Sequence, residues 1–380
     1  MDQVNAHKTL DYLIIGQGLV GTWLSYYALQ AEKTCMVVND SHTAAASQVA
    51  SGVINPVTGR RIVQTWMIDT FLPFALKAYS DLGVQLNSTI VREAPVVLIH
   101  PSLQMQESFE YRYEHDNVYL QKNNPSEFEA FMHAPFGTGQ INQTVWIDLN
   151  LMIAGWRQQL IDNAQYIDAK FNIADVKITN EGVTWNGIDA DRIIFCDGIG
   201  SMQNPYFKML PFAPNKGEAL IVEIKDLPNQ AIYKNNITIV PWKDQLFWVG
   251  SNYEWEFKDA SPSEDFRTKM EDALTQLLKI PFRVVEHLAG IRPANQERRP
   301  FVGMHPVPVV YGASIGEYAK MINGENWLPD SLFCNLLVVP MENWNRKQSY
   351  ILPIPPSPNL PNQRSILLYP SLCFFEGTVM

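Results

Sequence analysis

The sequence predicts an α/β fold with two domains, one organised around a strand-helix-strand unit and one made mostly of antiparallel strands. The first observation is the order strand, glycine turn, helix and strand over residues 12–38. The second is a set of short apolar or alternating stretches over 84–141 and 218–249, separated by turn residues. The third is length: 380 residues, 46% of them hydrophobic, exceed what one core usually holds.

The strand-helix-strand unit accounts for the first 40 residues. Strands are expected at 12–15 and 35–38, with a glycine turn at 16–21 and a helix at 22–30 between them. A second helix is expected over 69–82, because apolar residues recur there at spacings of three and four. Its apolar face should cover a sheet.

Residues 84–141 predict an inserted, mostly β region, after which the chain returns to the first domain and then enters the β region again. Asp148 is expected to cap a helix that runs to residue 163, and Ser263 to begin a helix that runs to residue 278. The remaining expected strands lie at 96–99, 111–113, near Phe171, near Val183, and at 192–195, 218–224, 236–240 and 246–249.

Charge and cysteine content exclude several classes of protein. A net charge of -10 without a long run of Lys or Arg disfavours a nucleic-acid partner. The four cysteines are scattered, with no pair at metal-ligand or redox spacing, which predicts free thiols, no metal site and a cytoplasmic protein. The polar start of the chain and the lack of a long apolar run predict neither export nor a membrane segment.

The strongest motif is GQGLVG, with Gly16, Gly18 and Gly21 placed between the first strand and the first helix. Glycine at these positions permits a tight turn, a close approach to a diphosphate and close packing of helix on strand, while the helix N-terminus favours anions. The alternative is a glycine turn that opens an ordinary strand-helix unit. In this context the motif favours dinucleotide binding.

The second strand ends at Asn39-Asp40, where dinucleotide-binding proteins place an acid that binds the adenosine ribose. Either Asp40 takes this role or Asn39 makes a weaker neutral bond, and a plain strand-ending turn is a third interpretation. Next, residues 44–56 are mostly small, which allows either close approach to a flat ligand or a tightly packed Ala/Ser helix.

Five segments occur together in the order of a known family: GQGLVG, ASQVASGVINPVTGRR (46–61), IIFCDGIGS (193–201), LPFAPNKGEALIV (210–222) and AGIRPANQERRPFVG (289–303). From about residue 9 to 306 the chain resembles the D-amino-acid oxidase superfamily, in particular bacterial glycine oxidases. The resemblance implies a Rossmann-like FAD-binding domain and a mostly antiparallel β substrate domain, both discontinuous. The expected boundaries are 1–85, 146–212 and 286–306 for the first domain, and 86–145 and 213–285 for the second.

The resemblance also implies roles for individual residues. Arg292 matches the arginine that pairs with the substrate carboxylate, and a planar guanidinium suits that partner. Tyr253 follows a predicted strand and either reaches the substrate or packs in a core or an interface. The positions implied for the cofactor are Gly16, Gly18 and Gly21 at the diphosphate, Asn39 or Asp40 at the ribose, and Ser47, Gly52, Asn55 and Gly198 along FAD.

In this family a hydride passes from a carbon that bears an amine to the flavin, so no catalytic acid or base from the protein is required. The implied substrate is a small amino or imino acid, and O2 or another acceptor reoxidises the flavin. The alternatives are a tRNA-modifying flavoprotein of the same fold, which would need a basic surface, and a degenerate member without cofactor.

The last 75 residues depart from the family. Ten of the 25 prolines lie there, and no second glycine-rich turn of the kind with which the family closes its flavin site follows residue 303. We hypothesise that residues 307–380 are an aberrant tail produced by a shifted reading frame near residue 307; the alternative is a divergent or degenerate member of the family.

Overall fold

The computed structural model describes residues 9–41, 45–65, 68–116, 118–295, 301–305, 307, 309–314 and 319–321, and three pairs at 350–351, 367–368 and 370–371. These residues form two compact units. The first unit takes its described residues from 9–45, 153–214 and 292–371, and the second from 46–152 and 215–291. Each unit therefore consists of segments that are far apart in the sequence.

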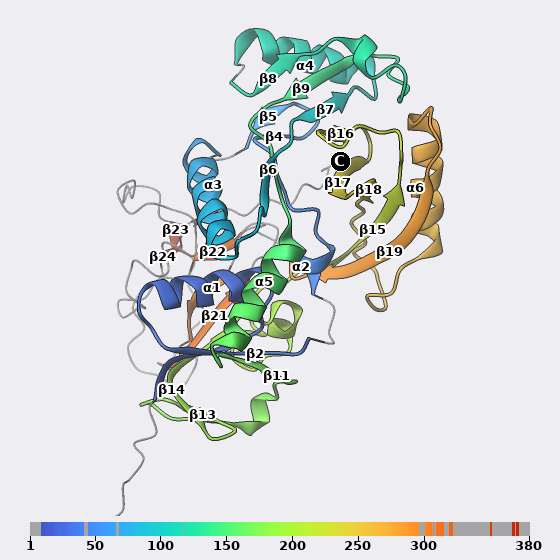
Figure 1. Ribbon diagram of the computed structural model, residues 1–380. Coiled ribbons are helices and arrows are strands. Elements are labelled where there is room, and N and C mark those ends of the chain that lie inside the picture. The colour runs from blue at the N-terminus through green and yellow to red at the C-terminus, as the bar shows by residue number, and fades with distance from the viewer. Residues whose placement is uncertain are drawn as a thin grey trace, which may run out of the picture. The chain divides into compact units, whose positions relative to one another are not determined.

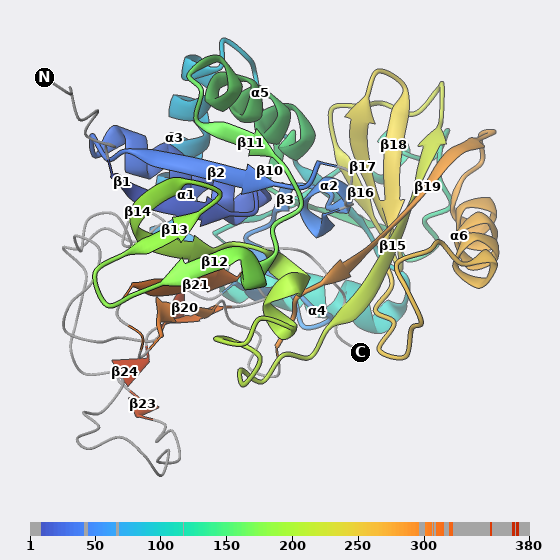
Figure 2. The same cartoon turned by 90° about the horizontal axis from the view of Figure 1, so that it is seen from below.

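The first unit is built on a sheet whose central strands are parallel (Figure 2). β1 (Leu10–Ile15) lies between β2 (Cys35–Asn39) and β14 (Ile188–Phe195), and all three run in the same direction. The sheet continues in parallel to β11 (Tyr166–Asp168) beyond β2 and to β21 (Val310–Ser314) beyond β14. The outer strands are β12 (Val176–Ile178), β13 (Val183–Trp185), β20 (Phe301–Met304), β22 (Ala319–Met321) and β25 (Pro370–Ser371).

Two helices of this unit lie side by side, α1 (Leu19–Gln30) and the part of α5 (Leu149–Asp162) from residue 153 onward (Figure 1). Trp156 of α5 donates a hydrogen bond from Nε1 to Ser25 Oγ of α1 at 2.8 Å. Its ring also meets Tyr26 edge to face, with ring centroids 5.4 Å apart. This buried pair fixes α5 against the helix that follows the glycine turn.

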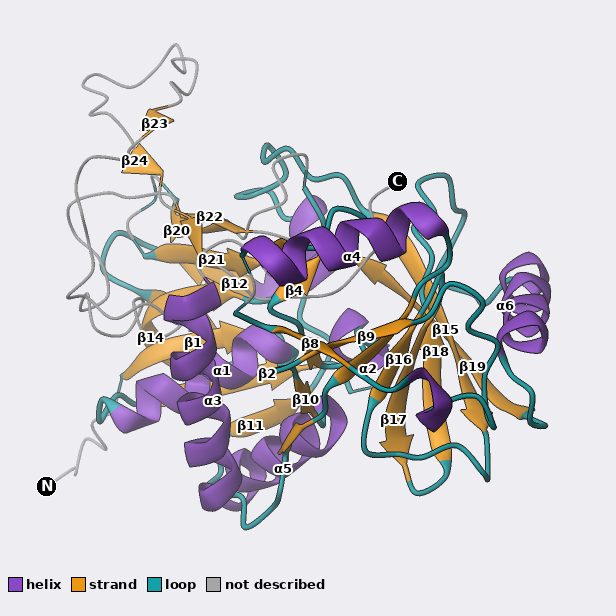
Figure 3. Ribbon diagram, turned by 90° about the horizontal axis from the view of Figure 1, so that it is seen from above, coloured by secondary structure: helices purple, strands orange, loops and turns teal. Residues whose placement is uncertain are grey.

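The second unit contains a mostly antiparallel sheet of eight strands, with α6 (Glu264–Leu277) beside it (Figure 3). Along the sheet, the pairs from β15 to β8 are antiparallel except that β16 and β7 run in parallel. The order is β19 (Arg283–Arg292), β15 (Asn215–Glu223), β18 (Leu246–Gly250), β17 (Thr238–Lys243), β16 (Ile232–Lys234), β7 (Val96–Ile99), β9 (Thr138–Ile141) and β8 (Leu120–Lys122).

Apolar residues from this sheet and α6 form one buried core. Its members from the strands include Leu220, Ile239 and Val249, and α6 adds Phe266 and Leu274. The alternation of apolar and polar residues in the strands and the three-four spacing in α6 direct these side chains to a shared interior.

The other elements of the structure are short sheets and separate helices. The helices are α2 (Ala46–Val49), α3 (Ile68–Gln85), α4 (Leu103–His115) and the 3-10 turns η1 (Pro125–Glu127), η2 (Ile173–Asp175) and η3 (Gly198–Met202). The strands are β3 (Val53–Ile54), β4 (Val57–Thr58), β5 (Val63–Gln64), β6 (Val91–Glu93), β10 (Val145–Ile147), β23 (Tyr350–Ile351) and β24 (Leu367–Leu368).

The expected α/β organisation with a parallel and a mostly antiparallel sheet is confirmed, and so are the helix caps. Asp148 Oδ1 accepts from the Leu151 amide at 2.9 Å, and Ser263 Oγ accepts from the Phe266 amide at 3.4 Å. Among the described residues, no helix combines the length and the apolar character needed to cross a membrane.

Two expected strands are wrong. Residues 111–113 belong to helix α4, which Ser102 caps through a 3.3 Å bond from the Met105 amide. The alternation of Tyr and Arg there resembles a strand, but the surrounding Leu, Gln, Met and Glu residues favour a helix. Phe171 lies outside the strands and packs on Trp185 and Phe195, because the strand in this region is the earlier β11.

Candidate functional site

The glycine turn after β1 has a conformation and a closeness of packing that only glycine permits. Gly16 has φ of +96°, and a Cβ atom on it would lie 2.4 Å from the carbonyl oxygen of Cys196, the residue after β14. A Cβ atom on Gly21 would lie 1.9 Å from the Gly16 carbonyl oxygen. The turn is therefore pressed against the carboxyl end of β14 on one side and against helix α1 on the other.

Helix α1 starts with its N-terminus open to an anion. Gly18 is the N-cap residue and has no side chain to cap the helix, and the first turn holds no acidic residue. The partial positive charge of a helix N-terminus and its amide groups stabilise phosphate. Gly16, Gly18 and Gly21 thus lie together at a helix start that has neither a capping side chain nor an acidic residue.

Asn39 lies beside this turn, and its side chain bonds at both ends. Its Oδ1 accepts from the Gln17 amide at 2.8 Å, and its Nδ2 donates to Tyr166 Oη at 3.3 Å. Burial is the main cause that raises the pKa of the Tyr166 phenol, and the nearby charges of Asp168 and Asp40, the residue after Asn39, add to the rise. Both sequence-predicted ribose candidates therefore stand at the carboxyl end of β2, with Asn39 bonded to the turn itself.

Gln17, the second residue of the motif, joins the turn to helix α5. Its Nε2 donates to Thr22 Oγ1 and to the Ile153 carbonyl oxygen, both at 3.0 Å, and its side chain is 2% exposed. Its Oε1 accepts from Arg157 Nε at 2.7 Å. Arg157 also lies over the Tyr166 ring, 5.7 Å from its centroid. No local sequence pattern marks the bonds from Gln17 to Ile153 and Arg157, because they join residues 136 and 140 positions apart.

Gly198 begins the 3-10 turn η3 directly after β14, at the same edge of the sheet as Gly16. Its φ is +55°, and nothing lies within 4 Å of the place a Cβ atom would take. The adjacent Asp197 is bonded to the Ser201 hydroxyl, and burial raises the pKa of this carboxyl despite that bond. The side chain of Asp197 therefore accepts a hydrogen bond from a residue of η3.

Ser47, Gly52 and Asn55 lie in the second unit. Ser47 is in the four-residue helix α2, and Gly52 has φ of +74° with a Cβ position 2.0 Å from the Ile147 carbonyl oxygen. Asn55 is fully buried, and its Oδ1 accepts from the Val57 amide at 3.0 Å. The helical interpretation of this small-residue segment therefore applies to Ala46–Val49, and the rest forms a turn and strand β3 packed against β10.

Arg292 is the last residue of β19 and Tyr253 follows β18, and both side chains are partly buried. Arg292 belongs to the first unit and Tyr253 to the second. Arg298, which follows Arg292 in the family-like segment, lies outside the described residues.

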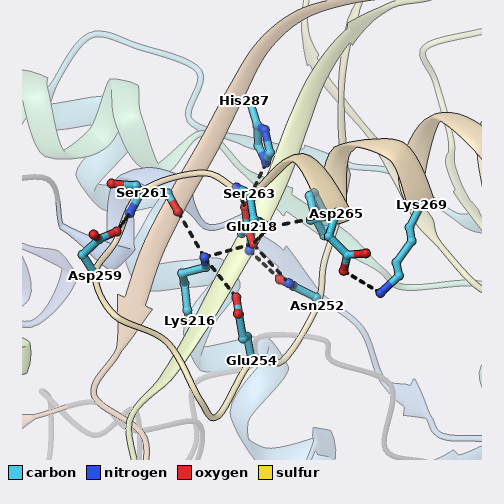
Figure 4. Close-up of polar contacts among 11 residues, drawn as sticks. Lys216, Glu218, Asn252, Glu254, Asp259, Ser261, Ser263, Asp265, Lys269 and His287 are labelled. Atoms are coloured by element: carbon cyan, nitrogen blue, oxygen red, sulfur yellow. Dashed lines mark hydrogen bonds and ion pairs between the residues drawn. The ribbon is translucent and has the colours of Figure 1, made fainter.

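The loop that carries Tyr253 is held by a buried polar cluster that sequence analysis also missed (Figure 4). Glu218 of β15 has a fully buried side chain and accepts from the Ser263 amide at 2.6 Å and from Ser263 Oγ at 2.7 Å. Lys216 Nζ lies 3.3 Å from Glu218 and 3.0 Å from Glu254, and it donates to the Ser261 carbonyl oxygen at 3.1 Å.

Two further contacts complete this cluster. His287 Nε2 lies 3.0 Å from Glu218 Oε2, and Asn252 Oδ1 accepts from the Glu218 amide at 2.8 Å. Burial alone would raise the pKa of Glu218, but the bonds from Ser263 and the charge of Lys216 outweigh burial and lower it. The cluster therefore fixes both ends of the segment 252–263 to β15.

The model of one protein family, described as FAD dependent oxidoreductase, matches residues 11–319. Glycine oxidase of Bacillus subtilis (strain 168) is 22% identical over 322 residues, which are 78% of this chain and 84% of that protein. The crystal structure of glycine oxidase from Bacillus cereus ATCC 14579 has a TM-score of 0.68 at 14% identity and covers 81% of this chain and 90% of its own. Iminodiacetate oxidase from Chelativorans sp. BNC1 has a TM-score of 0.65 at 15% identity, with coverages of 80% and 89%.

These findings confirm the expected fold class, a Rossmann-like FAD-binding domain with a β substrate domain, and FAD as the cofactor. The model of a second family, described as the N-terminal part of exo-beta-N-acetylmuramidase NamZ, matches residues 285–364. Peptidoglycan beta-N-acetylmuramidase NamZ of Bacillus subtilis (strain 168) is 36% identical over 113 residues, about a quarter of each protein. Much of the expected tail therefore resembles part of a second family, and the frameshift near residue 307 stays a prediction that the other reading frames of the coding DNA test.

Proposed function

The chain belongs to the family of FAD-dependent oxidoreductases, and we propose that it oxidises the carbon-nitrogen bond of a small amino or imino acid. The observation that carries this proposal is the match over residues 11–319 together with relatives named glycine oxidase and iminodiacetate oxidase. In this reaction the substrate loses a hydride from carbon and a proton from nitrogen and becomes an imine. FAD, when bound, supplies the hydride acceptor.

The diphosphate of FAD would lie against Gly16, Gly18 and Gly21. The structure supports this assignment because a Cβ atom on Gly16 or Gly21 would collide with backbone, while the start of α1 offers amide groups and the positive end of the helix. Ser47, Gly52, Asn55 and Gly198 are proposed to line the rest of the cofactor. Asn39 and Asp40 are the two proposed residues at its adenosine ribose.

Arg292 is proposed to bind the substrate carboxylate through two parallel hydrogen bonds. Such a bond holds the substrate in one orientation, so that the carbon that loses hydride always faces the same way. Tyr253 is proposed to contact the substrate from the loop that the Glu218 cluster fixes. O2 or another acceptor reoxidises the cofactor.

The first test is the visible absorption spectrum of the purified chain, with and without added FAD. Flavin bands that bleach when glycine, N-methylglycine or a small D- or L-amino acid is added without O2 would support the proposal. Readmitting O2, or adding a dye in its absence, would then identify the acceptor. A chain that takes up no FAD would refute the proposal and favour a degenerate member, whereas FAD that no amino or imino acid bleaches would refute the substrate class.

The role of Arg292 is tested by Arg292→Met with Arg283→Met as the matched control. Both arginines belong to strand β19, but Arg283 has an exposed side chain, 68% accessible, paired with Glu223. Loss of two charge-assisted hydrogen bonds should lower kcat/KM about 100-fold in the first variant, and the second should stay near wild type. Equal activity of the two variants would exclude Arg292 as the carboxylate partner.

A further inference from the structure

The residue at the usual ribose position, Asn39, is committed to the glycine turn. A carboxamide carries both an acceptor and donors, and Asn39 uses the acceptor on the Gln17 amide at 2.8 Å and a donor on Tyr166 Oη at 3.3 Å. A carboxylate at this position could make the first bond but could not donate to Tyr166. Asn39 therefore fits the task of joining the turn to β11 better than the task of binding a diol.

The bonds of Asn39 are part of a closed ring of four residues. Gln17 contacts Asn39 through its backbone and Arg157 through its side chain, Arg157 lies over Tyr166, and Tyr166 accepts from Asn39. The four residues come from four different elements: the turn, β2, β11 and α5. The ring holds the turn in its glycine-dependent shape, which makes Asn39 a positioning residue.

A carboxylate stands one strand further along the same edge of the sheet. β11 pairs with β2 in parallel, and Asp168 is the register partner of Asn39, so both residues end their strands at the carboxyl edge. Ligands of open parallel sheets bind at this edge. Asp168 is exposed, and its orientation is fixed by the Ser41 amide at 3.0 Å and by the Ser41 hydroxyl.

We propose that Asp168 of β11 supplies the carboxylate that binds the ribose hydroxyls of FAD, while Asn39 positions the glycine turn. The inference rests on the proposed placement of FAD at this turn. Two neighbouring hydroxyls donate well to the two oxygens of one carboxylate, and bonds to a charged acceptor are about twice as strong as neutral ones. The acid thus stands at the end of β11 instead of β2, and the pairing of the two strands places it at the same carboxyl edge of the sheet.

The test compares the binding of FAD with that of FMN, which lacks the adenosine, to protein stripped of flavin. Quenching of flavin fluorescence gives both dissociation constants without any turnover. Asp168→Asn should weaken FAD about 10- to 100-fold, because the charge-assisted bonds become neutral, and should leave FMN within about twofold of wild type. Asp162→Asn, the same change at an exposed residue of the same unit, should alter neither.

Two further variants separate Asp168 from the other candidates. Asn39→Asp restores an acid at the end of β2 but loses the donor to Tyr166, so FAD binding should not improve. Tighter FAD binding by this variant would overturn the inference, as would a loss for Asp40→Asn equal to that for Asp168→Asn.

The outcomes also distinguish this inference from the proposed function. If wild type binds FAD and Asp168→Asn binds it equally well, the inference alone falls. If Asp168→Asn weakens FAD and FMN alike, the residue maintains the fold of the site and the inference again falls. If wild type binds no flavin, the proposed function falls and the inference with it.

Discussion

Replacing Glu218 should destabilise the second unit more than any exposed acid on the same strand. Glu218→Ala removes the acceptor for two bonds from Ser263 and one charge of the ion pair with Lys216, whose side chain is 6% exposed. Removal of one partner from a buried ion pair costs about 3–5 kcal/mol. Because Lys216 keeps Glu254 at 3.0 Å, the lower end, about 3 kcal/mol, is expected.

Glu218→Gln keeps the shape of the side chain and one acceptor, so its cost reflects the loss of charge. Bonds to a charged group contribute about 1.5–3 kcal/mol and neutral bonds about 0.5–1.5 kcal/mol, so about 2 kcal/mol is expected for the two bonds from Ser263. The control is Glu223→Gln, on the same strand, where the partner Arg283 is largely exposed. That change should cost much less, because solvent screens an exposed ion pair.

Urea unfolding followed by tryptophan fluorescence measures these differences, since Trp248 lies in the same sheet. With a slope of about 2 kcal/mol per molar urea, the midpoint should fall by about 1.5 M for Glu218→Ala and about 1 M for Glu218→Gln. Glu218 has a lowered pKa in the fold, so its stabilisation is present above the unfolded pKa and is lost as pH falls through the folded pKa. Midpoints within about 0.3 M of the Glu223→Gln control would refute the view that this cluster stabilises the unit.

Two further substitutions and one labelling experiment test other parts of the structure. Gly21→Ala should abolish flavin retention, because its Cβ would lie 1.9 Å from the Gly16 carbonyl oxygen. Gly187→Ala is the control: its Cβ meets nothing within 4 Å, so it carries only the strain of φ at +78°, and it should retain flavin; absorbance of both purified variants decides. Burial lowers the pKa of His100 to about 4, so its contribution to the free energy of unfolding should fall by about 1.4 kcal/mol per pH unit as pH drops from 6.5 to 4. His100→Gln should lose this dependence. Urea midpoints that shift equally between pH 7 and pH 5 in wild type and variant would contradict it. Burial raises the pKa of the Cys35 thiol to about 12, so a thiol reagent should modify Cys35 only once the protein is unfolded. Mass spectrometry checks this, and modification of the folded protein would show that this strand opens.

The glycine turn and its flanking elements could be predicted from the sequence because their determinants are local. Gly16, Gly18 and Gly21 define the turn by spacing alone, and Asp148 and Ser263 define helix starts by the residues that follow them. Each of these features depends on neighbours within about one helical turn. For such features, residue type at a given spacing is enough.

The polar network around the turn could not be predicted in this way. Gln17 meets Arg157 only because α5 packs on α1, and Asp168 reaches the edge beside Asn39 only through the register of two parallel strands. A strand placed near Phe171 instead of at β11 hid the position of Asp168 as a strand-ending acid. Long-range register is set by tertiary packing, and a single sequence shows it only when every strand is placed correctly.

The tail shows a different limit. The change in composition after residue 305 was visible in the proline content, but composition alone could not distinguish a shifted frame from a segment related to another family. The similarity of residues 285–364 to the N-terminal part of a muramidase family adds information that composition lacks, because specific residues rather than their frequencies carry the match.

Strand β21 has a consequence for how the chain is synthesised. The exposed edge of β14 is covered only when Val310 and Tyr311 pair with Ile193 and Ile194, more than a hundred residues after β14 leaves the ribosome. Until then the central strand of the first unit presents an unpaired apolar edge of the kind on which chains aggregate. Residues 193–195 of β14 therefore keep one edge unpaired in the growing chain until the last parallel strand has been synthesised.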